Sequence, residues 1–402
     1  MQVTQGSAIC IYMNIQQLFF ELIQVALGVR ICLSRTPNDM EWKALYDMAK
    51  KQSLVGVCFA AVQKLSSKED SITHKPYTIN LPEVLYLTWL GMAAKIQQRN
   101  EVVNQQCVEL QAKLSADGFR SCILKGQGVA GIYTSTGSAQ VGSLSLLRQS
   151  GDIDVWIEGG VKAVVGLAQK LGQKTKVTEQ HVDFDIFPDT EVEAHFIPTM
   201  LKQPFANRRL QWWIEEQAST QFEHWNEAGL CVPTAEFNLV YLLIHIYRHL
   251  FGEGVGLRQV MDYYFVLKAR NNDNVLSKES VPEGRADDNG NLLHTLKSLG
   301  LMQFAGGLMY VMHEVFGLQR EEMLCEPNER HGRFLLNEIM LSGNMGHYDE
   351  RTKNADRSTR WKRFWLMNKH NFRLISYYPG ETLWAPFARI KVWAWRKWKG
   401  WI

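Results

Sequence analysis

Apolar residues recur at helical spacing through the first part of the chain. The spacing runs through residues 14–65, with a polar break at residues 34–39. A second stretch, residues 83–117, is polar on one side and apolar on the other, and it ends at Asp117-Gly118, a signal for a helix end. These patterns predict helices that each bury one face.

The hydrophobic period changes near residue 120. Short apolar runs of strand type follow, and residues 161–171 form a helical stretch that Gly172 ends. The order of strands and helices is typical of a small α/β unit. The predicted strands are residues 120–124, 153–157, 182–187 and 191–197.

Helical spacing returns after Pro233, in residues 236–251 and 257–269, and the polar run of residues 270–291 predicts a flexible excursion. The chain is therefore expected to have the α+β class, a small mixed sheet with flanking helices. Its expected regions are an N-terminal helical region (1–95), a core (96–232) and a C-terminal helical region (233–402).

The composition is that of a globular protein. A chain of 402 residues, 46% hydrophobic and 21% charged, can bury a sizeable core, which excludes disordered and fibrous proteins. The net charge of +3 is too small to indicate nucleic acid or an anionic membrane as the partner of the whole chain. The seven cysteines lie far apart without a C-x-x-C pair, which is typical of reduced thiols. No apolar run reaches the roughly 20 residues of a membrane span, so we expect a cytoplasmic protein without integral membrane association.

Candidate chemistry begins at Gly151-Asp152-Ile153-Asp154, where an apolar strand opens with two carboxylates. Residues two apart on a strand point to the same face, so Asp152 and Asp154 should converge. Two close negative charges favour a cation, and Mg²⁺ prefers carboxylates together with substrate phosphate oxygens. A D-x-D pair alone is also common in surface turns, but the neighbouring motifs favour a phosphoryl-transfer site.

Motifs on both sides of this strand resemble a known family. They are Leu124-Lys125-Gly126, Leu147-Arg148-x-x-Gly151-Asp152-Ile153-Asp154 and Val192-Glu193-Ala194-His195. Together they resemble the uncharacterised nucleotidyltransferase family often found in bacterial genomes, a branch of the DNA polymerase beta-like superfamily. The resemblance covers residues 14–267 and includes Glu41-Trp42-x-x-Leu45, His245-x-x-x-His249-Leu250-Phe251, Gly256-Leu257-Arg258 and Asp262.

The resemblance implies a metal-dependent transfer of a nucleoside monophosphate from a nucleoside triphosphate, such as ATP, to a hydroxyl acceptor, with release of pyrophosphate. Asp152 and Asp154 carry over as ligands of Mg²⁺, or of Mn²⁺, and Glu193 completes the set and is a candidate to take the acceptor's proton. Asp183 and Asp185 are rivals for the third position. We rank Glu193 first, because Asp189-Thr190 marks a hairpin that places Glu193 on the following strand.

The resemblance also implies a nucleotide and phosphate site. The turn Lys125-Gly126-Gln127-Gly128 departs from the superfamily pattern, which has a small hydroxylated residue after glycine, so Lys125 is expected to supply charge there. A Ser/Gly/Thr-rich loop at residues 134–142 replaces the proline that is usual in the family. Arg248 is also considered for contact with phosphates, because guanidinium groups suit them. The candidates are Lys125, Gly126, Gln127, Arg148, His249 and Arg258.

Other motifs are interpreted as structural. Residues 126–131 match G-x-G-x-x-G, but Asp152 and Asp154 precede their apolar strand instead of ending it, so a dinucleotide fold is not expected. His245 and His249 have zinc spacing, yet they lie in a core-facing run and are expected to pack. The basic C-terminus contains Trp393, Trp395, Trp398 and Trp401, which spread around a helix axis and are expected to pack against the body.

Two other functions fit the same sequence as alternatives to nucleotidyl transfer. In the first, the chain is a catalytically inactive relative that holds a nucleotide or sugar phosphate. In the second, it is an interaction scaffold whose helical flanks and basic tail dock on a partner. The acceptor stays open among a protein side chain, a sugar phosphate, a small alcohol and an RNA end.

Overall fold

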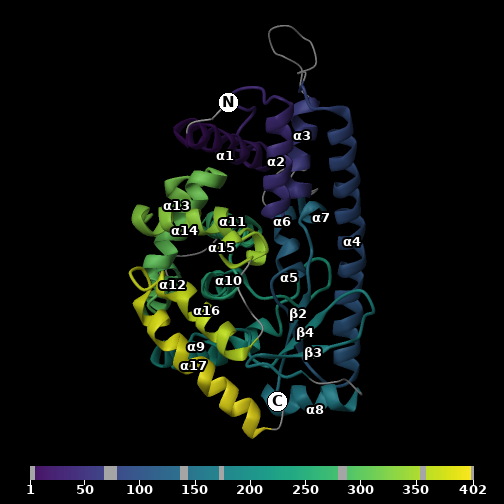
Figure 1. Cartoon of the computed structure of the whole chain (residues 1–402). Coiled ribbons are helices and arrows are strands. Elements are labelled where there is room, and N and C mark those ends of the chain that lie inside the picture. The colour runs from purple at the N-terminus through teal and green to yellow at the C-terminus, as the bar shows by residue number, and fades with distance from the viewer. Residues whose placement is uncertain are drawn as a thin grey trace.

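The computed structural model describes residues 5–67, 79–135, 144–171, 176–278, 288–353 and 359–399, in which helices predominate (Figure 1). The first helices are α1 (Gln5–Leu27), α2 (Asp39–Lys51), α3 (Val55–Ser66) and α4 (Glu83–Ala116). The middle of the chain contains β1 (Ser121–Ile123), α5 (Gln127–Ala130), α6 (Ile132–Ser135), α7 (Leu144–Leu147), β2 (Ile153–Ile157), α8 (Gly160–Lys170), β3 (His181–Phe184) and β4 (Val192–His195). The remaining helices are α9 (Pro204–Gln221), α10 (Ala235–Phe251), α11 (Leu257–Lys278), α12 (Asp288–Ser298), α13 (Met302–Phe316), α14 (Glu329–Ser342), α15 (Glu350–Lys353), α16 (Arg360–Phe372) and α17 (Pro379–Trp398), with 3₁₀ turns η1 (Arg320–Glu322) and η2 (Asn344–Gly346).

The described strands form a four-stranded mixed sheet in the order β1-β2-β4-β3. β2 and β4 run parallel at its centre, and β1 and β3 flank them in antiparallel orientation. The β3–β4 pair is the hairpin expected around Asp189, whose carboxylate forms an ion pair with Arg99 of α4. The expected α+β class with a small mixed sheet is confirmed.

One face of the sheet is apolar and is covered by α4 and α8. Ile153, Val155 and Ile157 of β2 alternate onto this face, as period-two patterning requires. The apolar side of α4 packs against them; Val103 is buried there, whereas Val102 is exposed. This packing fixes the opposite face of the sheet as the one available for chemistry.

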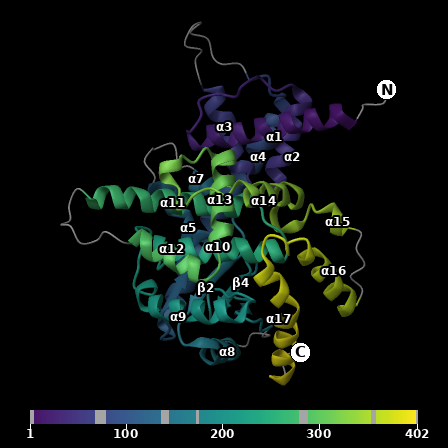
Figure 2. The ribbon, with the colours of Figure 1, turned by 90° about the vertical axis from the view of Figure 1, so that its left-hand side faces the viewer.

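The N-terminal and C-terminal helical regions share one core instead of forming separate ones. In Figures 1 and 2, α1 to α3 lie at one end of the molecule and the sheet at the other, with α10 and α11 between them. The hydrophobic residues of α10 and α11 are therefore buried by neighbours from both ends of the chain. α4 runs through the boundary expected at residue 95.

The polar excursion expected at residues 270–291 is largely helical where it is described. α11 continues to Lys278 and α12 begins at Asp288, while residues 279–287 lie outside the described residues. Two polar side chains reach partners elsewhere in the chain: the buried Arg270 donates a hydrogen bond from Nη1 to Asn289, and Asn271 donates one to the carbonyl of Glu322. Most of the loop at residues 134–142 also lies outside the described residues.

The tryptophans of the C-terminal helix divide into two groups. Trp395 packs against the smaller core beside the sheet, as expected. The same expectation is wrong for Trp393 and Trp398, which are 48% and 78% exposed, and Trp401 lies outside the described residues. None of the helices described here has the length and apolar character that crossing a bilayer requires.

Candidate active site

The second face of the sheet is polar, because the strand register aligns acidic side chains across it. Asp154 on β2 stands opposite Glu193 on β4, which stands opposite Asp183 on β3. Residues opposite one another in register point to the same face, and Asp152, two residues before Asp154, shares that face. The register thus concentrates negative charge on one surface.

Three of these carboxylates meet. Oxygen atoms of Asp152, Asp154 and Glu193 all lie within 4.8 Å of one another, and Asp183 is outside this group. Oδ2 of Asp154 is buried and accepts no hydrogen bond. A buried carboxylate oxygen without a hydrogen bond, in a group of three carboxylates, fits a hard divalent cation such as Mg²⁺. The structure brings together the three acids expected to do so.

Lys125 lies inside the carboxylate group. Its Nζ is 3.0 Å from Oδ2 of Asp154 and 3.6 Å from Oδ2 of Asp152, although it is not aligned for a hydrogen bond with Asp154. Burial lowers the pKa of Lys125, but Asp154 and Asp152 outweigh it and hold the pKa above its usual value. Lys125 therefore supplies positive charge to the acids directly.

His195 is a second cation in the group, and the sequence interpretation gave it no role. Its Nε2 lies 3.0 Å from Oδ1 of Asp154 and 3.3 Å from Oε2 of Glu193. Burial alone lowers the pKa of His195, but these two contacts raise it to about 9. Burial conversely raises the pKa of Glu193, and the contact with His195 outweighs it and lowers the pKa to about 2. The alternation of Glu193 and His195 on one strand is the signal that could have identified it.

A second group of ligand atoms overlaps the first. His181, Glu193 and His195 offer atoms within 4.8 Å of one another. Because imidazole nitrogens suit transition metals better than Mg²⁺, this set fits a softer ion than the carboxylates do. Glu193 is common to both groups.

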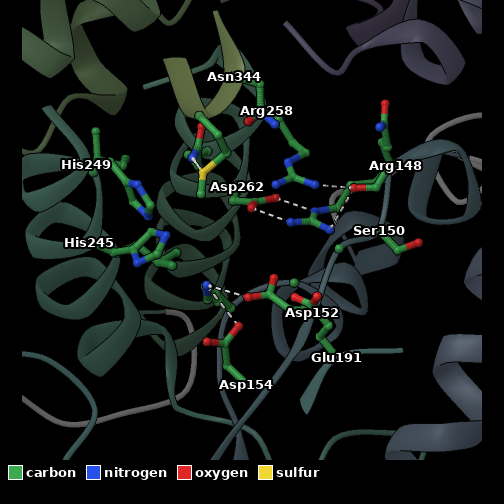
Figure 3. Close-up of a pocket in the computed structure, with 18 of the residues that line it drawn as sticks. Arg148, Ser150, Asp152, Asp154, Glu191, His245, His249, Arg258, Asp262 and Asn344 are labelled. Atoms are coloured by element: carbon green, nitrogen blue, oxygen red, sulfur yellow. Dashed lines mark hydrogen bonds and ion pairs between the residues drawn. The ribbon is translucent and has the colours of Figure 1, made fainter. Parts of the chain in front are cut away.

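A cavity of about 390 Å³ opens over the carboxylates (Figure 3). Asp152 and Asp154 form one wall, and Arg258, His245 and His249 from α10 and α11 lie across from them. The size is within the range of small-molecule sites, roughly 300–1,000 Å³. The cavity places charged groups of both signs around one space.

Arg148 lines this cavity, but its charge is already balanced. Its guanidinium forms a two-point ion pair with Asp262 of α11, at 2.6 and 2.7 Å, and Tyr133 donates a hydrogen bond to the same carboxylate. Both members of the pair are buried. The geometry gives Arg148 a structural part, since it fastens the segment before β2 to α11.

Arg258 is the better placed cation for a phosphate. Its Nη1 donates to the carbonyl of Gln149 at 2.8 Å, its Nε is buried without a partner, and no described carboxylate lies within ion-pair distance. A Cβ at Gly151 would lie 3.6 Å from the same Nη1, so the glycine leaves room beside the guanidinium. The charge of Arg258 is available to a ligand in the cavity.

His245 and His249 sit side by side on α10 with ring centroids 4.4 Å apart. Burial, followed by the charges of Lys125 and Arg248, lowers the pKa of His249 to about 3, and burial also holds the pKa of His245 well below its usual value. Both rings are therefore neutral near pH 7. Both rings are half-buried and line the cavity, and neither belongs to a ligand group found among the described residues.

The turn after β1 places its residues differently. Gly126, with φ of 56°, lines the cavity, whereas Gln127 is buried and donates hydrogen bonds to Asn100 and Asn104 of α4. The Gln127 side chain, expected at the phosphates, therefore does not line the cavity. A Cβ at Gly128 would lie 2.2 Å from the carbonyl oxygen of Ile123, so this glycine is required for packing, and β1 and β2 are antiparallel, which no dinucleotide βαβ unit allows.

Sequence reasoning missed the far wall of the cavity. Asn344, Met345 and His347 reach it from the segment after α14, nearly two hundred positions from Asp152. No local pattern marks them. Arg248, conversely, faces away from this cavity and donates a hydrogen bond to Gln180 beside β3.

Comparison with known proteins identifies a family. Residues 38–317 match the family described as "Uncharacterised nucleotidyltransferase". No curated protein and no solved structure matches the chain. The matched residues contain the whole sheet, the three clustered acids and α10 and α11, and they make up well over half of the chain. The chain therefore belongs to the uncharacterised nucleotidyltransferase family.

Proposed function

We propose that the chain transfers a nucleoside monophosphate from a nucleoside triphosphate to a hydroxyl acceptor on a polymerase beta-like core. The observation that carries the proposal is the meeting of Asp152, Asp154 and Glu193 within 4.8 Å beside a cavity. These three side chains hold the divalent ion, Mg²⁺ or Mn²⁺. When bound, the ion supplies positive charge to the phosphate oxygens and lowers the pKa of the acceptor hydroxyl.

The residues of the chain position the reactants. Arg258 binds the terminal phosphates, and Lys125 adds charge on the side of the aspartates. The acceptor oxygen forms a bond to the α-phosphorus while the bond from that phosphorus to its bridging oxygen breaks. Pyrophosphate leaves with the electron pair, and the acceptor proton passes to Glu193 or to solvent. The neutral rings of His245 and His249 close the cavity without adding charge.

A second candidate function rests on Lys125. Its ammonium lies among the same oxygens that a divalent ion needs. A protein in which this lysine permanently replaces the ion would bind a nucleotide or sugar phosphate without transferring it. The two functions differ in whether a divalent ion is required for turnover.

The test uses each α-labelled nucleoside triphosphate with Mg²⁺ or Mn²⁺ and a cell extract as the source of acceptor. Label should move into a product with the wild type and should be lost in Asp152→Asn and Asp154→Asn. Asp183→Asn, on the same sheet face but outside the three-acid group, is the matched control and should retain transfer. Nucleotide binding that does not depend on the divalent ion, together with the absence of a labelled product, supports the second candidate function instead.

A further inference from the structure

A second cavity, of about 180 Å³, lies on the β3 side of the polar sheet face. It is formed by the segment that leads into β3, by α10 and by α17, which runs past the sheet (Figure 2). The lining residues are Thr178, Glu179, Gln180, His181, Arg248, Val392 and Arg396.

The cavity has an excess of positive charge. Arg248 lies 3.8 Å from Glu179, which balances one guanidinium. Arg396 has no ion pair among the described residues, and its Nε is buried without a hydrogen-bond partner. A half-buried guanidinium without a counter-ion, whose Nε is buried, favours an anionic ligand.

Gln180 adds an unsatisfied donor to the same wall. The residue is 4% exposed; its Oε1 accepts a hydrogen bond from Arg248, while its Nε2 has no acceptor. Buried amide donors are nearly always paired in folded proteins. Together with Arg396, Gln180 supplies buried donors that an oxygen-rich group can satisfy.

The second cavity adjoins the acidic group through His181. His181 lines it, and Nδ1 of His181 lies 3.3 Å from Oε2 of Glu193. Glu193 therefore contacts a residue of the second cavity and shares the three-acid group with Asp152 and Asp154, which line the first cavity. In-line transfer requires the acceptor oxygen to approach the α-phosphorus from the side opposite the leaving pyrophosphate.

We propose that the second cavity binds the acceptor, and that the acceptor carries a phosphate or carboxylate group held by Arg396, Gln180 and Arg248. This inference rests on the proposed nucleotidyl transfer. α17 lies outside residues 38–317, which match the family. The acceptor is therefore selected by a segment of this chain beyond the matched region.

Binding is tested first, by equilibrium dialysis of the full-length protein with labelled inorganic phosphate. Two phosphates should bind, and Arg396→Gln should weaken one site at least about tenfold, as expected for loss of a charged hydrogen-bond donor. Arg258→Gln should weaken the other site, and Lys391→Gln, an exposed change on the same helix, should weaken neither. Unchanged phosphate binding by Arg396→Gln overturns the proposal.

Transfer is then tested with extract separated on an anion exchanger. The retained, anionic fraction should accept the label, and Arg396→Gln should raise the KM for that fraction with little change in kcat. Label that moves only to the neutral fraction overturns the acceptor assignment and leaves nucleotidyl transfer standing. If phosphate binds but the wild type labels nothing, nucleotidyl transfer and the acceptor role fail together, and only an anion site remains.

A separate observation concerns the outer side of α17. Leu383, Phe387, Ile390 and Trp398 are each more than half exposed, at 55%, 64%, 54% and 78%. Their spacing places these four side chains on one side of the helix, where they form an apolar stripe. The tryptophans alone form no stripe, as expected. α16 adds exposed Trp365 and Phe372.

The charge around this surface is strongly positive. Residues 359–399 contain ten lysines and arginines, and their one acidic residue, Glu381, is buried, where it accepts hydrogen bonds from the backbone N–H groups of Lys202 and Gln203, just before α9. Lys391 and Lys397 are exposed beside the apolar stripe. Aromatic and aliphatic side chains surrounded by lysine suit the boundary between anionic headgroups and acyl chains.

We also infer that this apolar and basic surface of α16 and α17 binds an anionic membrane surface. It is independent of the second cavity, because Val392 and Arg396 lie on the inward side of α17. Flotation with vesicles of equal parts phosphatidylglycerol and phosphatidylcholine should carry the wild type upward, and vesicles of phosphatidylcholine alone should carry much less.

Phe387→Glu with Ile390→Glu should reduce the floated fraction at least about tenfold, because charge is costly at an acyl boundary. Val84→Glu, at a still more exposed apolar position on α4 (79%), is the control and should float like the wild type. A wild type that stays at the bottom with both vesicles overturns the inference. Self-association that the double variant abolishes, without any flotation, assigns the surface to a second copy of the chain instead.

Discussion

The ammonium group of Lys125 lies 3.0 Å from Oδ2 of Asp154, whose side chain is only 1% exposed. This pair keeps the acidic group compatible with folding when no divalent ion is bound, because it offsets repulsion among the carboxylates. A divalent ion held by the three acids, as proposed, would compete with the ammonium for the same oxygens. Lys125 therefore links the stability of the fold to occupation of the site.

Lys125→Met should lower the free energy of unfolding by about 3 kcal/mol in the presence of a chelator, since it leaves buried carboxylates without their partner. Mg²⁺ should restore much of the loss, because an ion that binds only the folded state stabilises it. Urea unfolding with EDTA and with Mg²⁺ measures both effects. Lys170→Met, at a 70% exposed side chain, is the control, and an equal response to Mg²⁺ in all three proteins would contradict the competition.

The buried ion pair between Arg148 and Asp262 also predicts a loss of stability, although both residues line the cavity. Asp262→Asn should cost about 3–5 kcal/mol of stability, because the buried guanidinium loses its counter-ion. The double variant Arg148→Met with Asp262→Asn should be less destabilised than the sum of the single changes. Denaturant unfolding of the four proteins gives the coupling, and additive losses would show that the pair does not act as a unit.

The site could be anticipated where its residues share a strand pattern. The period of a strand places Asp152 and Asp154 on one face, whereas the choice of Glu193 as their partner came from the family resemblance, helped by the turn at Asp189 that sets it on the following strand. The α+β class was recoverable from the same changes of period.

The rest depends on contacts distant in sequence. Lys125 was expected to meet phosphates, and only the packing of β1 against β2 shows that it reaches the aspartates first. Gln127 follows it directly, yet the short helix α5 turns its side chain to α4. Asn344 lies in a segment with no hydrophobic period, so nothing local connects it with the cavity.

His249 makes the stability depend on pH. Its pKa is about 3 in the folded protein and about 6.5 in an unfolded chain, so below pH 6.5 only the unfolded state gains the proton. Stability should therefore fall as the pH is lowered from about 6.5 toward 3, by about 2 kcal/mol at pH 5 for this group. His249→Gln should remove that part of the loss. Unfolding free energies of both proteins at pH 7 and pH 5 decide this, and parallel losses would contradict the buried neutral ring.

The far wall of the first cavity depends on close contact between two turns that contain glycine, the turn after α10 at Gly254 and the turn after α14 at Gly346. A Cβ at Gly346 would lie 1.7 Å from the carbonyl oxygen of Glu253, and Gly346 has φ of 66°. The turn after α14 therefore carries Asn344 and His347 to the cavity only because Gly346 has no side chain.

Gly346→Ala should cost at least about 2 kcal/mol, from the left-handed backbone and the displaced turn together. It should also weaken nucleotide binding, since the wall that holds Asn344 moves. Gly91→Ala is the matched control, because a Cβ on this α4 glycine meets nothing within 4 Å and alanine favours a helix. Thermal unfolding of the two variants measures the effect on stability, and nucleotide titration measures the effect on binding. A Gly346→Ala protein that loses stability but keeps wild-type nucleotide affinity would show that this turn supports the fold without shaping the site.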